Sequence, residues 1–171
     1  GSELGTWKFI SMQTNISSTF EGVQSGMNVK VVTTGDYTTT NNGGTITFDD
    51  PHMSFAGLTY AVNTTAKAAM YMNDILIRYT DLRITGSQPP TDDTGEYEKF
   101  RADSIYVQSD ALSIIDAGGI LQSSGIGFKL RWNGNQMTMT THMQQIRDEE
   151  YMGMPVKANI DATAGLTLEK Q

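Results

Sequence analysis

The sequence has no cysteine among its 171 residues, which excludes disulfides, thiolate metal sites and cysteine nucleophiles. Basic residues are also scarce, since 12 Lys and Arg stand against 19 Asp and Glu and leave a net charge of −7. Without a basic field to attract phosphates, we expect no nucleic-acid partner. No apolar run approaches the ~18 residues that a membrane-spanning helix needs, so we expect no transmembrane span.

The strongest pattern that is present is the alternation of apolar and polar residues along short segments. This alternation places successive side chains on opposite faces of a β-strand. It is clearest at 126–132 and again at 137–143, and the Asn133-Gly134 dipeptide lies between these segments. Because Asn-Gly tolerates the positive φ angles of a tight type I′ turn, we expect a β-hairpin here.

Clusters of Gly, Asn, Asp and Pro divide the rest of the chain into short segments. The expected turns are 41–44, 49–51 and 73–74, and the Pro-containing stretch 86–95 is the clearest expected loop. The expected strands are 45–48, 53–62, 66–72, 75–85, 97–100, 104–108 and one or two strands within 155–168. The stretch 111–124 fits either a short helix or a strand broken at Gly118-Gly119, and it stays unassigned.

About nine or ten short strands joined by tight turns predict an all-β antiparallel meander. We expect one domain over residues 1–171. Such a sheet removes its exposed edges when it closes into an up-and-down β-barrel, here of about 8 to 10 strands. A two-sheet β-sandwich is the alternative.

The segment from Leu4 to Ser11 resembles the first strand of lipocalin-like proteins, which carries Gly-x-Trp followed by alternating apolar residues. In this sequence the motif is Gly5-Thr6-Trp7. The resemblance implies a β-barrel in which Trp7 packs across the closed base and Gly5 allows a close approach of strands. It also implies an open end that admits an apolar ligand, and a basic residue over the tryptophan, for which Arg131 and Arg147 are candidates.

The chain is also similar to the divergent lipocalin-like proteins of Bacteroidetes, which are exported as lipoproteins. This resemblance implies a location in the periplasm, at the outer membrane or on the cell surface. It further implies an N-terminal lipid anchor ahead of Gly1. The start without Met and the lack of Cys agree with this expectation.

Methionines at strand spacing favour an adaptable apolar interior, because thioethers on flexible stems fit ligands of varied shape. If the barrel holds a cavity, strand parity predicts its lining: Phe9, Met70, Met72, Ile77, Tyr79, Phe128, Leu130, Met137 and Met139. Tyr79 or Arg78 would then orient the polar head of the ligand. A core filled by the same side chains is the alternative, because a narrow barrel packs its own interior whether or not it binds anything.

Residues that could catalyse a reaction or bind a metal are few and scattered. His52 and His142 lie on separate expected strands, without the pattern of a catalytic triad and too few for a zinc site without carboxylates. The acidic clusters 49–50, 92–93 and 148–150 lack the alternating ligand spacing of a calcium loop. We therefore assign no catalytic residue, metal or cofactor.

The leading functional expectation is non-enzymatic binding of a small apolar molecule, such as a fatty acid or another lipid, inside the barrel. The alternative is a filled barrel that acts as an interaction or scaffold module at the cell surface. Its function would then lie in its loops, above all in residues 86–95. A hydrolase that uses acidic loop residues is a third hypothesis, and it requires two facing carboxyl groups.

Overall fold

The computed structural model describes residues 1–109, 112–116, 119–122, 125–151 and 153–171, and the regular elements among them are all β-strands. The all-β prediction is therefore confirmed. Within these residues, no helix has the length and apolarity that a membrane crossing requires. The strands are β1 Gly5–Gln24, β2 Met27–Thr38, β3 Thr40–Asp49, β4 His52–Met72, β5 Ile75–Arg101, β6 Ser104–Gln108, β7 Ser113–Asp116, β8 Gly119–Gln122, β9 Ile126–Asn133, β10 Gln136–Tyr151 and β11 Met154–Lys170.

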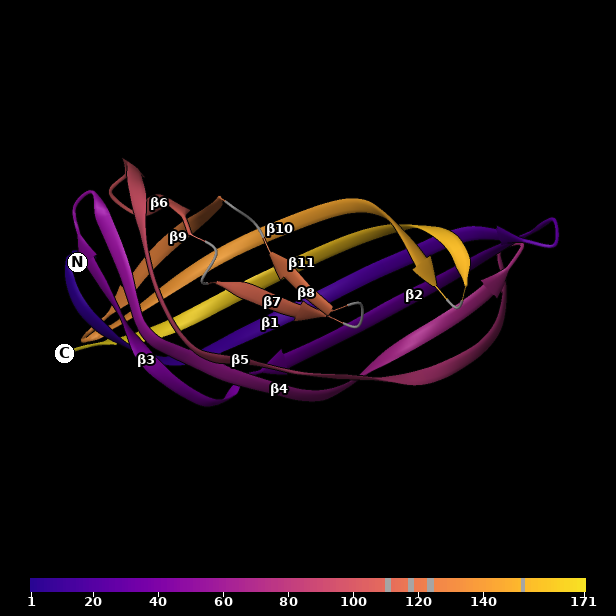
Figure 1. Cartoon of the computed structure of the whole chain (residues 1–171), viewed down its shortest axis with the longest axis horizontal. Helices are drawn as coiled ribbons and strands as arrows, with labels where there is room; N and C mark the ends of the chain where they lie inside the picture. Colours follow the sequence, from indigo (N-terminus) through magenta and orange to yellow (C-terminus); the bar gives the residue numbers. More distant parts are fainter. Residues whose placement is uncertain (110–111, 117–118, 123–124, 152) are drawn as a thin grey trace.

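Nine of the strands form one antiparallel sheet that closes on itself (Figure 1). β2 and β3 share one position between β1 and β4, so the order around the ring is β1, β2 with β3, β4, β5, β6, β9, β10 and β11. β11 then pairs back onto β1, from Trp7↔Lys170 to Glu21↔Lys157. This pairing of the first strand with the last confirms the up-and-down barrel and replaces the sandwich alternative.

The ring is complete at one end only, which we call the closed end. There β6 pairs with residues 96–101 of β5, and β9 pairs with residues 136–140 of β10. Residues 75–94 of β5 and 141–151 of β10 continue toward the opposite end, each with a single paired neighbour in the described part of the chain. We call this opposite end the split end. In Figure 1 both termini lie near the closed end, and the long strands extend away from it.

Because apolar and polar residues alternate along the strands, the side chains inside the ring are mostly apolar. On β11, every second residue from Val156 to Leu168 is buried, and the residues between them are not. Several inward positions carry small residues instead of large ones: Gly35, Ala66, Ala68, Ala158, Ala162 and Ala164. Small inward residues leave space inside the ring for a further segment of chain.

The stretch 41–44 is not the turn that we expected, because it lies inside β3. The register between β3 and β4 shifts on both sides of Gly43, and Asn41 and Gly44 have φ values of 51° and 94°. These residues therefore form β-bulges, which bend a strand without reversing the chain. A Cβ at Gly44 would lie 2.5 Å from the carbonyl oxygen of Gly57, so the two strands approach closely here.

The expected loop at 86–95 is also wrong, because these residues belong to β5. Pro89 and Pro90 lie where the register with β4 shifts, between Leu58 and Tyr60. Proline is tolerated in this strand because β5 is an edge strand at these positions and needs no second set of N–H donors. Likewise, the expected strands 53–62 and 66–72 are parts of one strand, β4.

Three expected turns are present. The turn at 49–51 joins β3 to β4, since Asp49 pairs with His52. Asn73 and Asp74 join β4 to β5 with φ values of 47° and 63°, as a type I′ turn requires. The β9–β10 hairpin also forms, but its turn residues are Gly134 and Asn135, because Asn133 still pairs with Gln136. The turn thus lies one residue later than we expected.

Two segments whose structure the sequence left open are the tail 155–168 and the stretch 111–124. A single strand, β11, covers the tail in which we expected one or two strands. Within the unassigned stretch 111–124, β7 and β8 form an antiparallel hairpin. Residues 111, 117–118 and 123–124 lie outside the described residues.

Candidate functional site

The β7–β8 hairpin is the element that distinguishes the interior of this barrel. It forms a two-stranded sheet of its own and has no backbone ladder with the ring in the described part of the chain. The side chains of Leu112 and Ile114 are buried, and they face inward residues of β1 and β11 such as Met12 and Ala164. The segment that starts β7 therefore fills space that the small inward residues leave open.

A crevice of about 10 Å³ remains between this segment and the ring, which is close to the smallest volume that holds one water molecule. The crevice has almost no polar surface. Its lining residues are Met12, Leu112, Ser113, Ile114, Ile126, Phe128, Thr141, Met143, Ala164 and Leu166. β7 thus nearly fills an apolar site whose walls come from β1, β9, β10 and β11.

Side-chain hydrogen bonds hold β7 in place. The hydroxyl of Tyr60 on β4 donates to the carbonyl oxygen of Ser113 at 2.6 Å and lies 2.9 Å from its Oγ. The Ser113 hydroxyl donates to Oε1 of Gln88 on β5 at 3.1 Å. Burial raises the pKa of the Tyr60 hydroxyl above its ordinary value, although its hydrogen bonds to Ser113 oppose this shift, so the hydroxyl remains a donor.

Thr141 places one polar atom in the crevice. Its side chain is buried, and its Oγ1 has no hydrogen-bond partner among the described residues. A buried hydroxyl without a partner costs about 1–3 kcal/mol. Thr141 follows directly after the last β10 residue that pairs with β9, so this hydroxyl lies where the ring begins to open.

The structure brings together most, but not all, of the predicted lining residues. Phe9, Phe128, Leu130, Met137 and Met139 are buried in one core, and Phe9 packs edge to face on Tyr60 with ring centroids 6.0 Å apart. Of these residues, Phe128 lines the crevice.

The other predicted lining residues lie farther from the core. Met70 and Met72 are half-buried on β4, and Met70 packs against the core. Ile77 and Tyr79 are exposed on β5, as is Arg78, so the prediction that they line the interior or orient a ligand there is wrong. They lie at the split end, where no described strand pairs with the outer edge of β5.

Half of the residues that line the crevice gave no signal in the sequence. Ala164 and Thr141 are small or polar, so their parity did not mark them as cavity residues. Leu112 and Ile114 fall in the stretch that fitted either a helix or a strand. Met12, Met143 and Leu166 do alternate with polar neighbours, and this alternation could have added them to the predicted lining.

Gly5 and Trp7, the predicted base motif, lie at the closed end. Trp7 is buried, and its indole N–H donates to the carbonyl oxygen of Glu3 at 2.5 Å. The cation over its ring is Lys170, the last residue of β11, whose Nζ lies 4.5 Å from the ring centroid. Arg131 is exposed and Arg147 forms an ion pair with Glu149, so neither of the two predicted arginines holds this position.

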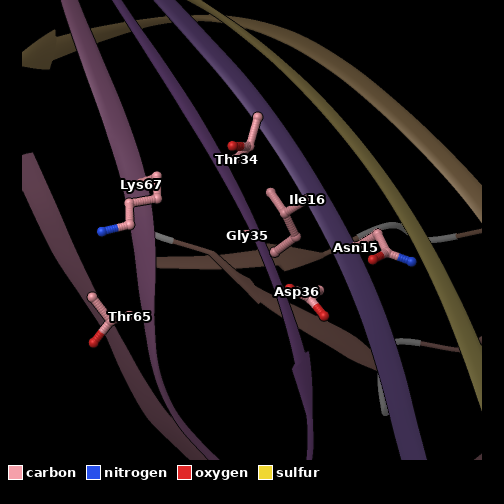
Figure 2. A pocket seen from close by; sticks show the side chains of 7 residues that line it. All are labelled: Asn15, Ile16, Thr34, Gly35, Asp36, Thr65 and Lys67. Atoms are coloured by element: carbon pink, nitrogen blue, oxygen red, sulfur yellow. The ribbon is translucent and has the colours of Figure 1, made fainter. Parts of the chain in front are cut away.

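A groove of about 450 Å³, with polar and apolar surface in similar amounts, lies over β1, β2 and β4. Figure 2 shows Thr65 and Lys67 on one side of Gly35 and Asn15 on the other. Lys67 already forms an ion pair with Asp81 at 2.7 Å. The groove is open to solvent and about half of its surface is polar, so it is a weaker candidate than the crevice for an apolar ligand.

Among the described residues, neither the crevice nor the groove has a histidine in its lining. In the ranges that the structure describes, no group of three or more His, Asp or Glu side chains is close enough to hold a metal ion. His142 lies 3.0 Å from Asp161 on the surface. Comparisons with known protein families, with curated proteins and with solved structures find no match to this chain.

Proposed function

We propose that this protein binds a small apolar ligand, such as a fatty acid or another lipid, between β7 and the inner wall of the ring. We propose no catalytic role. The observation that carries the proposal is that an apolar wall is covered by a segment without backbone pairing to that wall in the described residues. Without a ligand, β7 covers the apolar wall, and a bound ligand displaces β7 from it.

The free energy lost when β7 leaves the site is similar to the free energy gained when an acyl chain is buried there. Exposing Leu112 and Ile114 costs about 1.5–3 kcal/mol for each side chain. An acyl chain regains ~0.8 kcal/mol for each methylene group that it buries, so about four to eight methylene groups offset the loss. Medium and long acyl chains therefore meet the requirement, and very short ones do not.

Two further features support the same ligand class. In the described part of the chain, no strand pairs between β5 and β10 at the split end, and we propose this side of the barrel as the route of the ligand to the crevice. The orphaned hydroxyl of Thr141 can bind the polar head of the ligand at that point. The nearly filled crevice also fits the alternative of a filled interaction module, but the loop expected to carry that function, at 86–95, is part of β5.

An exported, lipid-anchored location in the periplasm, at the outer membrane or on the cell surface belongs to the same proposal. It rests on the resemblance of Gly5-Thr6-Trp7 to the lipocalin-like motif. A carrier of apolar molecules is useful in such aqueous compartments, where its ligand would otherwise leave solution.

The experiment that tests the proposal fixes the hairpin to the ring. Because the chain has no cysteine, Gln88→Cys and Ser113→Cys together create a unique pair of thiols at two side chains that are in contact. A short bis-methanethiosulfonate reagent joins the pair, and a reductant removes it. Binding of cis-parinaric acid, followed by its fluorescence and by native mass spectrometry, should weaken at least tenfold in the joined protein and recover after reduction.

The two single-cysteine variants, treated with the same reagent, are the controls for the substitutions and for the label. Equal binding in the joined and reduced proteins would contradict a site behind β7. An unmodified protein that takes up neither cis-parinaric acid nor a mixture of fatty acids would overturn the proposed function itself.

A further inference from the structure

The outer edge of β5 is the longest unpaired strand edge in the described part of the chain. Residues 75–94 pair with β4 on one side only, and the pairing is free of register shifts from Arg78 to Gln88. A regular, unpaired edge presents a row of N–H and C=O groups that a further strand can pair with. The neighbouring apolar side chains Ile75, Ile77 and Tyr79 are 67, 52 and 69% exposed.

Two of the usual protections of an edge strand, proline and a β-bulge, are missing from the middle of this edge. Pro89 and Pro90 block pairing only beyond Gln88, and the bulge near Ile77 disturbs only the first residues of the strand. Between them, residues 78–86 carry no proline and no bulge. This segment is therefore free to pair with a strand from another molecule.

We propose that residues 78–86 of β5 pair antiparallel with the same residues of a second copy of this chain, with Leu82 at the two-fold axis. Along β5, the backbone N–H and C=O groups of successive residues point alternately toward β4 and toward the free edge. Two residues that face each other in an antiparallel pair must have the same orientation. The two-fold axis of a self-pairing therefore passes through a residue and not between two residues. With Leu82 there, Asp81 faces Arg83 of the second copy, and Arg83 faces Asp81 of the second copy. The two barrels then share one continuous sheet.

The charges on β5 select this register. Asp81 and Arg83 are two residues apart, so they lie on one face of the strand and are both exposed. The axis at residue 81 would place Asp81 opposite itself, and the axis at residue 83 would place Arg83 opposite itself. The axis at residue 80 or 84 leaves both charges opposite neutral residues or places them outside the pairs. With the axis at Leu82, both charges are matched by opposite charges.

Hydrogen bonds within each copy position the side chains of Asp81 and Arg83 for this pairing. Asp81 accepts a hydrogen bond from Lys67 at 2.7 Å, and Arg83 donates to Asn63 at 3.3 Å, both on neighbouring β4. These contacts hold the side chains on the outer face of the sheet. In the dimer the row would run Lys67, Asp81, then Arg83 and Asn63 of the second copy, so cationic and anionic groups alternate.

The other free edge, on β10, is less suited to self-pairing. Asp148, Glu149 and Glu150 follow one another there, so two such edges would bring acidic residues together. Like charges that face each other across two strands are destabilising. The charge pattern therefore favours β5 as the interface.

A charge-exchange experiment tests the proposed register. Sedimentation equilibrium over a range of protein concentrations measures the dissociation constant of the dimer. Asp81→Arg alone and Arg83→Asp alone should each weaken the dimer at least tenfold, and the double exchange should return the constant to within about threefold of the original. Lys129→Ala removes an exposed lysine on β9, away from residues 78–86 of β5, and it is the control for a change of surface charge.

Cysteine substitution tests the position of the axis directly. In the proposed dimer, Leu82 lies opposite itself, with Cα atoms about 4.5–5.5 Å apart, a range that permits a disulfide. Leu82→Cys should therefore form a disulfide-linked dimer on mild oxidation, and Ile146→Cys on the edge of β10 should not. A protein that stays monomeric at all concentrations overturns the proposal, as does linkage through Ile146→Cys instead of Leu82→Cys.

Discussion

The ammonium group of Lys170 lies 4.5 Å from the centroid of the Trp7 ring, so the last residue of the last strand covers an aromatic residue of the first. Lys170 also donates a hydrogen bond to the carbonyl oxygen of Leu4. One side chain thus joins the N-terminal segment, β1 and β11 at the closed end, where the register between β1 and β11 begins.

We expect Lys170→Met to lower the free energy of unfolding by about 1 kcal/mol, because a cation over a tryptophan ring contributes about 0.5–2 kcal/mol. Urea denaturation followed by circular dichroism measures the change. Lys129→Met is the control, since Lys129 is exposed and its ion-pair distance to Asp103 is 3.7 Å. Equal stability of the two variants would show that the contact with Trp7 contributes nothing.

A second prediction compares two glycines. Gly44 has a φ of 94°, and a Cβ there would meet the backbone of Gly57 and Leu58. Gly44→Ala should therefore lower the free energy of unfolding by at least about 2 kcal/mol, through backbone strain and steric overlap. Gly127 has open space around its Cα, so Gly127→Ala should change stability by less than ~0.5 kcal/mol. A mild effect at Gly44 would contradict the bulge geometry.

Much of the fold could be predicted from alternation, because a strand that is buried on one face repeats every second residue. The errors lie where turn-forming residues occur inside strands. Gly44 has the positive φ that is typical of a turn, yet the chain continues in β3 and stays paired with β4. Pro89 and Pro90 remove donors that an edge strand does not need. Local conformation alone does not distinguish a bulge from a turn, since the pairing with a distant strand decides.

The candidate site could be predicted only in part, for a related reason. Parity places Met137 and Tyr79 on expected strands equally well, yet Met137 is fully buried and Tyr79 is 69% exposed. Alternation indicates which residues share a face, but not whether another element covers that face. At the crevice the cover is β7, which lies in a stretch without a clear period. Beside Tyr79, the ring is incomplete in the described part of the chain.

A third prediction concerns alkaline pH and Tyr97. Burial, together with the negative charges of Glu3, Asp50 and Asp49, raises the pKa of Tyr97 to about 12. Below pH 10 this tyrosine is neutral in both the folded and the unfolded chain. Between pH 10 and about 12, the unfolded chain loses the proton and the folded chain keeps it, so stability falls as the pH rises.

The size of this effect is at most about 2–3 kcal/mol, since one pKa unit corresponds to about 1.4 kcal/mol. Tyr97→Phe removes the titrating group, and its stability should decline less over the same pH range. Urea denaturation at several pH values measures both proteins, and absorbance of tyrosinate near 295 nm reports the ionisation. Identical slopes for the two proteins would contradict the raised pKa.

The last prediction links stability and ligand binding through Thr141. Thr141→Val keeps the shape of the side chain and removes a buried hydroxyl that has no partner among the described residues. We expect the free energy of unfolding to rise by about 1 kcal/mol, because the cost of the unpaired group is gone. If this hydroxyl binds the head group, the affinity for cis-parinaric acid should fall about fivefold to tenfold, which corresponds to one lost hydrogen bond.

Thr33→Val separates these two effects. The Oγ1 of Thr33 is also buried and unpaired among the described residues, but Thr33 does not line the crevice. Thr33→Val should therefore stabilise the chain by a similar amount and leave the affinity unchanged. If Thr141→Val stabilises the protein and binding is unaffected, the ligand head lies elsewhere, and if it destabilises the protein, the hydroxyl already has a partner in solution. If the Thr141 hydroxyl lowers stability in order to bind the ligand, both variants should be more stable than the original protein, but only Thr141→Val should also bind the ligand more weakly.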